Sequence, residues 1–201
     1  MFKLTSLLTL LFFVSCSSFK AERVDAEGAD KKAMKITDEW VRGDTERAVK
    51  RVLSQMKKHK GYLRYMARYH GQPKVFVANI QNKTAEAYFP VDDMTDEFLY
   101  EISAEGDFIL VDKGAREAIL EEIKYQNDGM VDPMTAKKIG KQIGADLMIF
   151  GAVYMKPSTR SGKTIKDYSV NIRMTDIEKA VEVLRTRAKI SKYSEQASSG
   201  W

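Results

Sequence analysis

Cysteine and histidine are scarce in this chain of 201 residues, which has one cysteine and two histidines. A single cysteine excludes an intramolecular disulfide framework and a cysteine-rich zinc site. His59 and His70 provide little material for a metal centre or a catalytic triad, and the sequence assembles no nucleophile, base and orienting group. We therefore expect a protein that works by binding, that is not an enzyme, and that holds no cofactor or metal.

No apolar run at the N-terminus is long enough to cross a bilayer. Residues 7–14 (LLTLLFFV) form a run of eight, whereas a helix spanning the ~30 Å hydrocarbon core needs about 20 residues. With Lys3 before it, the run fits the core of a signal peptide. It ends in Phe13-Val14-Ser15-Cys16, which resembles a bacterial lipobox. The alternative is an ordinary secretory signal followed by an incidental cysteine.

The lipobox resemblance implies that residues 1–15 are a lipoprotein signal peptide and that Cys16 becomes the lipidated, palmitoylated N-terminus. Ser17 follows Cys16 where inner-membrane lipoproteins of enteric bacteria carry Asp, which indicates anchoring in the outer membrane, facing the periplasm. Between Ser17 and Ile36, nine of twenty residues are charged and no apolar periodicity is present. Residues 16–38 are therefore predicted to be the lipidated cysteine and a charged tether.

Residues 39–193 are predicted to form one domain, followed by a flexible tail over residues 194–201. Apolar residues spaced three and four apart indicate helices, and alternation with a period of two indicates strands. Asp44 is the expected N-cap of the first helix, and Gly106 and Gly144 are expected to end later ones. The predicted helices cover residues 44–56, 62–69 and 90–106, with two more between 112 and 144. The predicted strands cover residues 74–80, 108–111, 147–155, a segment around 168–174, and 181–192.

This order of elements predicts an α/β fold with a mixed sheet packed by helices, parallel at its start and with hairpins at its end. Charge is unevenly distributed along the sequence. Residues 84–135 contain 14 acidic and 3 basic side chains, whereas residues 43–72 contain 8 basic and 2 acidic ones. The uneven charge indicates either solvated faces of mixed sign or a polarised surface that steers a partner. The export signal excludes nucleic acid as that partner.

The connection Gln81–Pro90 is the predicted partner-binding segment. Tyr88 and Phe89 are adjacent there, and Lys83 lies on the same segment. Two adjacent rings cannot both face the core from a regular helix, so at least one is expected to be exposed. Exposed aromatic residues beside charge are typical interface anchors. The alternative is that both rings plug the edge of the sheet and order the loop.

Several stretches of the sequence, in order behind the lipobox, resemble one family. They are Trp40–Asp44 (W-x-x-x-D), residues 74–84 (KVFVANIQNKT), 108–112 (FILVD), 135–151 with its G-x-x-x-G-A-D pattern, and 168–177 (YSVNIRMTDI). Together they are similar to the LpoB family of lipoproteins, which activate bifunctional penicillin-binding proteins. The sequence departs from the family's pattern at Lys179-Ala180 and Leu184, where a Ser-Gly turn and a Trp are usual. Its tether is also short and has no proline-rich run.

The resemblance implies a fold similar to the N-terminal domain of TolB and a role in peptidoglycan synthesis, cell wall biogenesis and cell shape. By that resemblance, the protein binds and activates a class A penicillin-binding protein in the periplasm, held in the outer membrane by its lipid anchor. Peptidoglycan is a second candidate partner. The alternative is a structural or secretion-linked envelope lipoprotein of the curli-secretion type.

Overall fold

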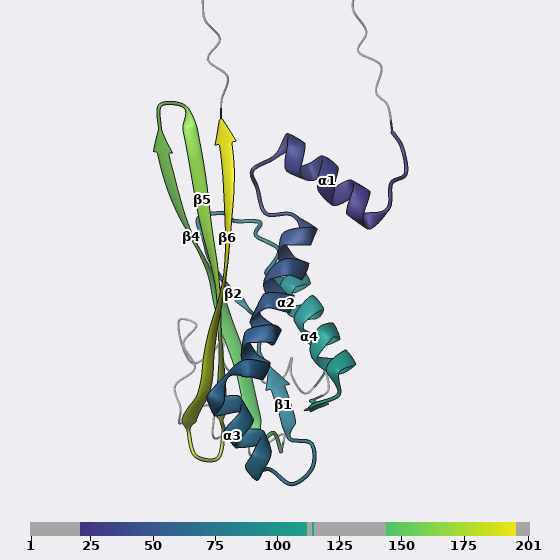
Figure 1. Ribbon diagram of the computed structural model, residues 1–201, viewed down its shortest axis with the longest axis vertical. Helices are drawn as coiled ribbons and strands as arrows, with labels where there is room; N and C mark the ends of the chain where they lie inside the picture. Colours follow the sequence, from purple (N-terminus) through teal and green to yellow (C-terminus); the bar gives the residue numbers. More distant parts are fainter. Residues whose placement is uncertain (1–20, 112–113, 115–143, 196–201) are drawn as a thin grey trace, which may run out of the picture.

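The computed structural model describes residues 21–111, 114 and 144–195. The chain begins with helices α1 (Ala26–Ile36), α2 (Arg42–Lys58) and α3 (Lys60–Arg68), followed by strands β1 (Lys74–Val77) and β2 (Gln81–Lys83). Then come helix α4 (Val91–Glu105) and strands β3 (Ile109–Leu110), β4 (Leu147–Arg160), β5 (Lys163–Asp176) and β6 (Val181–Glu195). Helices α2, α3 and α4 lie on one side of the sheet (Figure 1).

The sheet is mixed, as predicted. Its strand order is β3-β1-β4-β5-β6, and β2 pairs with β4 beyond the end of β1. Strands β1, β2 and β3 make parallel pairs, whereas β4, β5 and β6 form antiparallel hairpins. The prediction that Gln81–Pro90 is a connection without regular structure is wrong for its first three residues, which form β2. Its backbone pairs with β4 at 152–154, and that pairing outweighs the polar character of its side chains.

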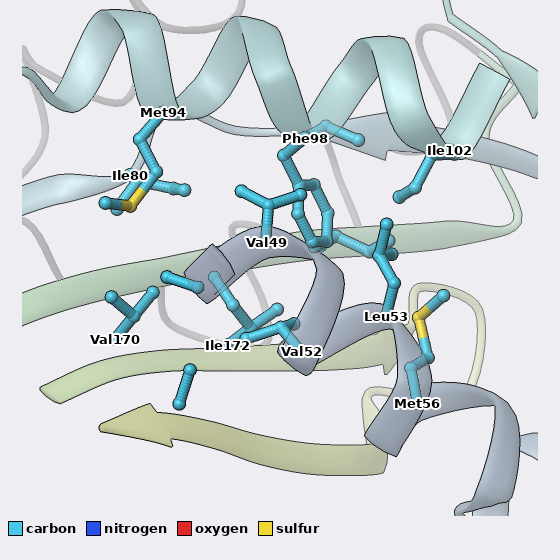
Figure 2. Packing of buried hydrophobic residues seen from close by; sticks show 14 of the residues in the cluster. Val49, Val52, Leu53, Met56, Ile80, Met94, Phe98, Ile102, Val170 and Ile172 are labelled. Carbon is cyan, nitrogen blue, oxygen red and sulfur yellow. The ribbon is translucent and has the colours of Figure 1, made fainter. Parts of the chain in front are cut away.

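The main core lies between helices α2 and α4 and the sheet (Figure 2). The expected apolar faces are confirmed: Val49, Val52, Leu53 and Met56 of α2 are almost fully buried, as are Met94, Phe98 and Ile102 of α4. On β5 the alternating residues Tyr168, Val170, Ile172 and Met174 face the same core. Burying an aliphatic or aromatic side chain stabilises the fold by about 1.5–3 kcal/mol each, so this layer is the main source of stability.

Gly106 ends a helix as the sequence predicts, and Gly144 has the backbone conformation expected of it. Gly106 follows α4 with a φ of 71°, and Gly144 has a φ of 64° just before β4. Both values lie in the left-handed region that glycine adopts without steric cost. The two helices predicted between 112 and 144 lie outside the described residues.

Strands β4, β5 and β6 are long and extend past the end of α2 (Figure 1). We call residues 156–166 and 191–195 the distal ribbon. Most of its side chains are exposed, and a two-residue turn at Ser161-Gly162, with φ values of 51° and 73°, joins β4 to β5. Strand β4 therefore continues past its predicted end at residue 155, as far as Arg160. Strand β6 continues through Glu195, two residues into the predicted tail, where it pairs with Lys163 beside this turn.

The predicted tether contains a helix that the sequence analysis did not anticipate. Helix α1 buries none of its residues, and Asp25 caps it by accepting a hydrogen bond from the Gly28 amide at 2.6 Å. Its link to the domain is Asp30, which accepts from the Gly43 amide and pairs with Arg47. Local capping and helix propensity thus order α1 without a hydrophobic interface. No helix in the described ranges combines the length and apolarity needed to span a membrane.

Candidate functional site

The loop between β2 and α4 places the two predicted anchor rings in opposite environments. Tyr88 is 100% exposed, whereas Phe89 is 5% exposed. The Phe89 ring packs against Trp40 at a centroid distance of 5.0 Å and against Tyr168 at 5.9 Å. The prediction of Phe89 as a partner-binding residue therefore fails, because its ring fills an aromatic cluster of the core. Tyr88 and Lys83 are exposed and stay available to a partner.

This difference predicts unequal costs for two neighbouring substitutions. Phe89→Ala is expected to lower the free energy of unfolding by about 3–5 kcal/mol, because it leaves a cavity between Trp40 and Tyr168. Tyr88→Ala is expected to change it by no more than about 0.5 kcal/mol. Urea denaturation of the two single variants measures both values. Equal midpoints for the two variants would show that the Phe89 ring is not part of the core.

Side-chain hydrogen bonds hold this loop in one conformation. The Asn82 carboxamide oxygen accepts from the amide and the hydroxyl of Thr84, and the Asn82 amide group donates to the Glu86 carbonyl at 2.7 Å. The Glu86 carboxylate accepts from the Tyr168 hydroxyl at 2.6 Å and from Lys166 at 3.2 Å. Burial, followed by this hydrogen bond to Glu86, raises the pKa of Tyr168. Asn82 and Thr84, which carried part of the family resemblance, thus order the loop that presents Tyr88.

The same network reaches the segment that joins α1 to α2. Lys166 also pairs with Asp38 at 3.2 Å, and the Ser194 hydroxyl donates to Asp38 at 2.6 Å. The Ser194 hydrogen bond is the main cause that lowers the pKa of Asp38. Burial opposes the charge on Lys166, but its two carboxylate partners outweigh that effect and raise its pKa. Asp38 therefore fastens the chain to the distal ribbon where it enters the domain.

The residues of the W-x-x-x-D stretch are structural as well. The Trp40 indole donates to the Thr45 hydroxyl at 2.8 Å. Asp44 is not the N-cap of α2, because the helix begins at Arg42 and Asp44 lies in its first turn. There its carboxylate accepts from the Val41 amide at 3.0 Å and forms an ion pair with Lys192 at 2.6 Å. Sequence analysis missed Lys192, which is 8% exposed on β6.

One exposed aromatic residue beside the predicted site was also missed. Tyr154 lies on β4 within the predicted apolar strand 147–155, yet half of its surface is exposed. It pairs in register with Lys83 on β2, so the two side chains point to the same face of the sheet. Lys83, Tyr88 and Tyr154 are three exposed side chains of this region, and we call them the loop surface.

A cleft of about 590 Å³ lies between α3 and the turn that joins β5 to β6. Its wall carries Tyr65 and Tyr69, whose rings stack at a centroid distance of 5.8 Å and an angle of 19°. Tyr69 donates to the Asp146 carboxylate at 2.6 Å, and this bond is the main cause that raises the pKa of Tyr69 to about 12. No motif in the sequence pointed to this cleft.

The histidines have no catalytic geometry. His59 caps α3 by accepting a hydrogen bond from the Gly61 amide, and His70 is exposed. Within the described ranges, no three His, Cys, Asp or Glu side chains come close enough to hold a metal ion. Cys16, the predicted lipidation site, lies outside the described residues.

The comparison that decides the family is a match of residues 44–190 to the family described as "Peptidoglycan-synthase activator LpoB". The chain belongs to the LpoB family. The matched range extends from the buried Asp44 to Ile190, so it includes strands β1 to β5 and most of β6. LpoB proteins are regulatory activators in peptidoglycan synthesis and not enzymes, and they act in the periplasm as envelope lipoproteins.

Solved LpoB structures share this fold. The C-terminal domain of LpoB from Salmonella enterica aligns with a TM-score of 0.54 and 11% identity, covering 73% of this chain and 98% of that domain. The corresponding domain from Escherichia coli aligns with a TM-score of 0.52 and 12% identity, covering 74% and 99%. No curated protein matches the sequence. The similarity to the N-terminal domain of TolB, which the family resemblance implies, stays a prediction.

Proposed function

We propose that this protein is an outer-membrane lipoprotein, anchored through Cys16, that binds a class A penicillin-binding protein in the periplasm and raises its synthetic activity. The match to the family of peptidoglycan-synthase activators over residues 44–190 carries the proposal. The lipobox-like Phe13–Cys16 sequence and the following Ser17 support the anchor and its membrane. In this role the protein contributes to cell wall biogenesis and cell shape.

Activation follows from differential affinity. A regulator shifts a synthase between an inactive and an active conformation only if it binds the active one more tightly. A preference of about 4 kcal/mol corresponds to roughly a thousandfold shift in that equilibrium. The domain needs no reactive group for this effect, and a rigid surface complementary to the active conformation is sufficient.

The loop surface is the proposed contact region. Tyr88 presents its whole side chain to solvent on a loop that Asn82, Thr84 and Glu86 already hold in place. Because the loop is ordered before binding, little conformational entropy remains to be lost on association. Lys83 and Tyr154 add a cation and a second exposed ring from the neighbouring strands.

The test uses the purified lipoprotein in detergent, a purified class A synthase and fluorescent lipid II. We expect the wild-type protein to bind the synthase and to increase its rate of glycan polymerisation. Tyr88→Ala is expected to raise the Kd about 30-fold, the equivalent of ~2 kcal/mol. Its thermal unfolding should match that of the wild type, because Tyr88 makes no core contact.

Tyr193→Ala is the matched control. Tyr193 is also an exposed tyrosine, but it lies on the distal ribbon, where its hydroxyl donates to Glu195. The control is expected to bind and activate the synthase as the wild type does. A wild-type protein that neither binds nor stimulates the synthase contradicts the proposed function. Equal affinities for Tyr88→Ala and Tyr193→Ala contradict only the proposal that the loop surface contacts the synthase.

A further inference from the structure

Helix α3 and the β5–β6 turn, which line the cleft, lie at the opposite end of the domain from α1 and the distal ribbon (Figure 1). Hydrogen bonds and ring stacking fix the side of the cleft formed by Tyr65, Tyr69 and Asp146. The Asp146 carboxylate accepts from the Tyr69 hydroxyl at 2.6 Å and from the Lys74 amide at 2.8 Å, which joins α3 to the start of β1. Tyr65, stacked on Tyr69, is half-buried, and burial is the main cause that raises its pKa. The two rings thus form a fixed flat surface.

Most carboxylates around the cleft already have partners. Asp176 is buried, accepts from the Lys179 amide at 2.9 Å, and pairs with the Lys179 ammonium at 3.0 Å. Glu182 pairs with Arg185 through two hydrogen bonds. These groups cannot take a ligand charge without giving up an existing bond.

Three charged groups at the cleft form no ion pair or side-chain hydrogen bond within the described part of the chain, although Glu178 lies near enough to Lys179 to add to the effect of the Asp176 hydrogen bond, which raises the pKa of that ammonium. Arg64 and Arg68 lie one helical turn apart on α3, both exposed, and neither forms an ion pair there. Glu178, exposed on the β5–β6 turn, has no hydrogen-bonding partner either. The cleft therefore offers two guanidinium groups on one side and one carboxylate on the other, beside stacked rings.

This arrangement fits a short peptide that carries carboxylates and a free ammonium group together. Guanidinium groups form bidentate hydrogen bonds with carboxylates, and the planar rings suit packing against peptide planes. A purely acidic segment would be repelled by Glu178 and by the carboxylates of Asp146 and Asp176. A purely basic segment would be repelled by Arg64 and Arg68. Only a ligand of both signs complements the whole cleft.

Resting on the proposed function, we infer that the cleft binds the stem peptide of peptidoglycan, the polymer that the synthase makes. A stem peptide is short, has several free carboxylates, and keeps a free amine where it has not been cross-linked. Arg64 and Arg68 bind its carboxylates, and Glu178 binds the amine. The site therefore prefers stem peptides that are not cross-linked, so the activator recognises newly made glycan near the synthase.

The test titrates the full protein with a purified disaccharide-tetrapeptide and follows binding by calorimetry. We expect a Kd below about 1 mM. The disaccharide without its peptide is expected not to bind. Arg64→Gln combined with Arg68→Gln should raise the Kd at least about tenfold, since both carboxylate partners are lost. Arg160→Gln, a substitution of an exposed arginine on the distal ribbon, is the matched control and should leave the Kd unchanged.

A second comparison tests the role of Glu178. Glu178→Gln should weaken binding of the free-amine peptide and leave binding of its N-acetylated form unchanged. The inference is wrong if the wild type does not bind the peptide at about 5 mM, or if the double arginine variant binds it as the wild type does.

The synthase assay separates this inference from the proposed function. The double arginine variant is expected to activate the synthase in solution with lipid II alone. If the variant loses synthase binding and the wild type never binds the stem peptide, the cleft is a protein contact. In that case this inference fails while the proposed function stands.

Discussion

Cys16→Ala is expected to release the protein from the membrane into the soluble fraction of the periplasm. The attached acyl chains contribute about 0.8 kcal/mol per buried methylene group, and two or three of them hold a domain at a membrane durably. The midpoint of thermal unfolding should stay unchanged, because the core begins at Trp40, well beyond the lipidation site. Fractionation of cells followed by immunoblotting measures the distribution.

Ser17→Ala is the matched control for the release experiment. It lies next to Cys16 and keeps the thiol, so it should leave the protein in the membrane fraction. Ser17→Asp adds a test of the sorting argument: in an enteric host it should move the protein from the outer to the inner membrane. A Cys16→Ala protein that stays in the membrane fraction would show that the protein is held there by something other than lipid.

Asp44→Ala is expected to be among the most destabilising single substitutions in the domain. Asp44 is 1% exposed, and its carboxylate joins Lys192, Arg47 and the Val41 amide. Removing it leaves the Lys192 ammonium buried without a counter-charge, which costs about 3–5 kcal/mol. For a domain of this size, that loss lowers the melting temperature by roughly 6–20 °C. Calorimetry or circular dichroism measures the shift.

Two further variants make the Asp44 prediction specific. Asp92→Ala removes an exposed carboxylate in the first turn of α4, where the expected cost is only about 0.3–1 kcal/mol from the helix dipole. Lys192→Met in the Asp44→Ala background should recover part of the loss, because the uncompensated charge is removed. Similar melting temperatures for Asp44→Ala and Asp92→Ala would show that the buried ion pair contributes nothing.

Local patterns in the sequence were enough to predict most elements of the fold. The apolar faces of α2 and α4 repeat with helical spacing, and Tyr168–Met174 alternate with the period of a strand. These signals depend on neighbours within a few residues. The polar strand β2 escaped prediction because its pairing with β4, about 70 residues later, decides its conformation. Helix α1 was not predicted because it has no apolar face against the domain.

The functional residues were harder to predict for the same reason. Adjacent rings indicate that one of Tyr88 and Phe89 is exposed, but only the positions of Trp40 and Tyr168 decide which one. Asp44 and Lys192 are separated by almost the whole domain in sequence, so no local pattern relates them. The cleft likewise forms only when the β5–β6 turn comes to lie beside α3.

If Cys16 is lipidated as proposed, helix α1 can lengthen the tether between the lipid and the domain. Its 11 residues bury no side chain, and Asp30 links it to α2. Helical residues advance about 1.5 Å each and extended ones about 3.5 Å, so unwinding α1 lengthens the tether by roughly 20 Å. Asp38, fastened to Lys166 and Ser194, protects the core from that extension. In the proposed role, tension on the lipidated N-terminus therefore unwinds α1 before it strains the domain, so the distance to the synthase can change while the proposed binding surface stays folded.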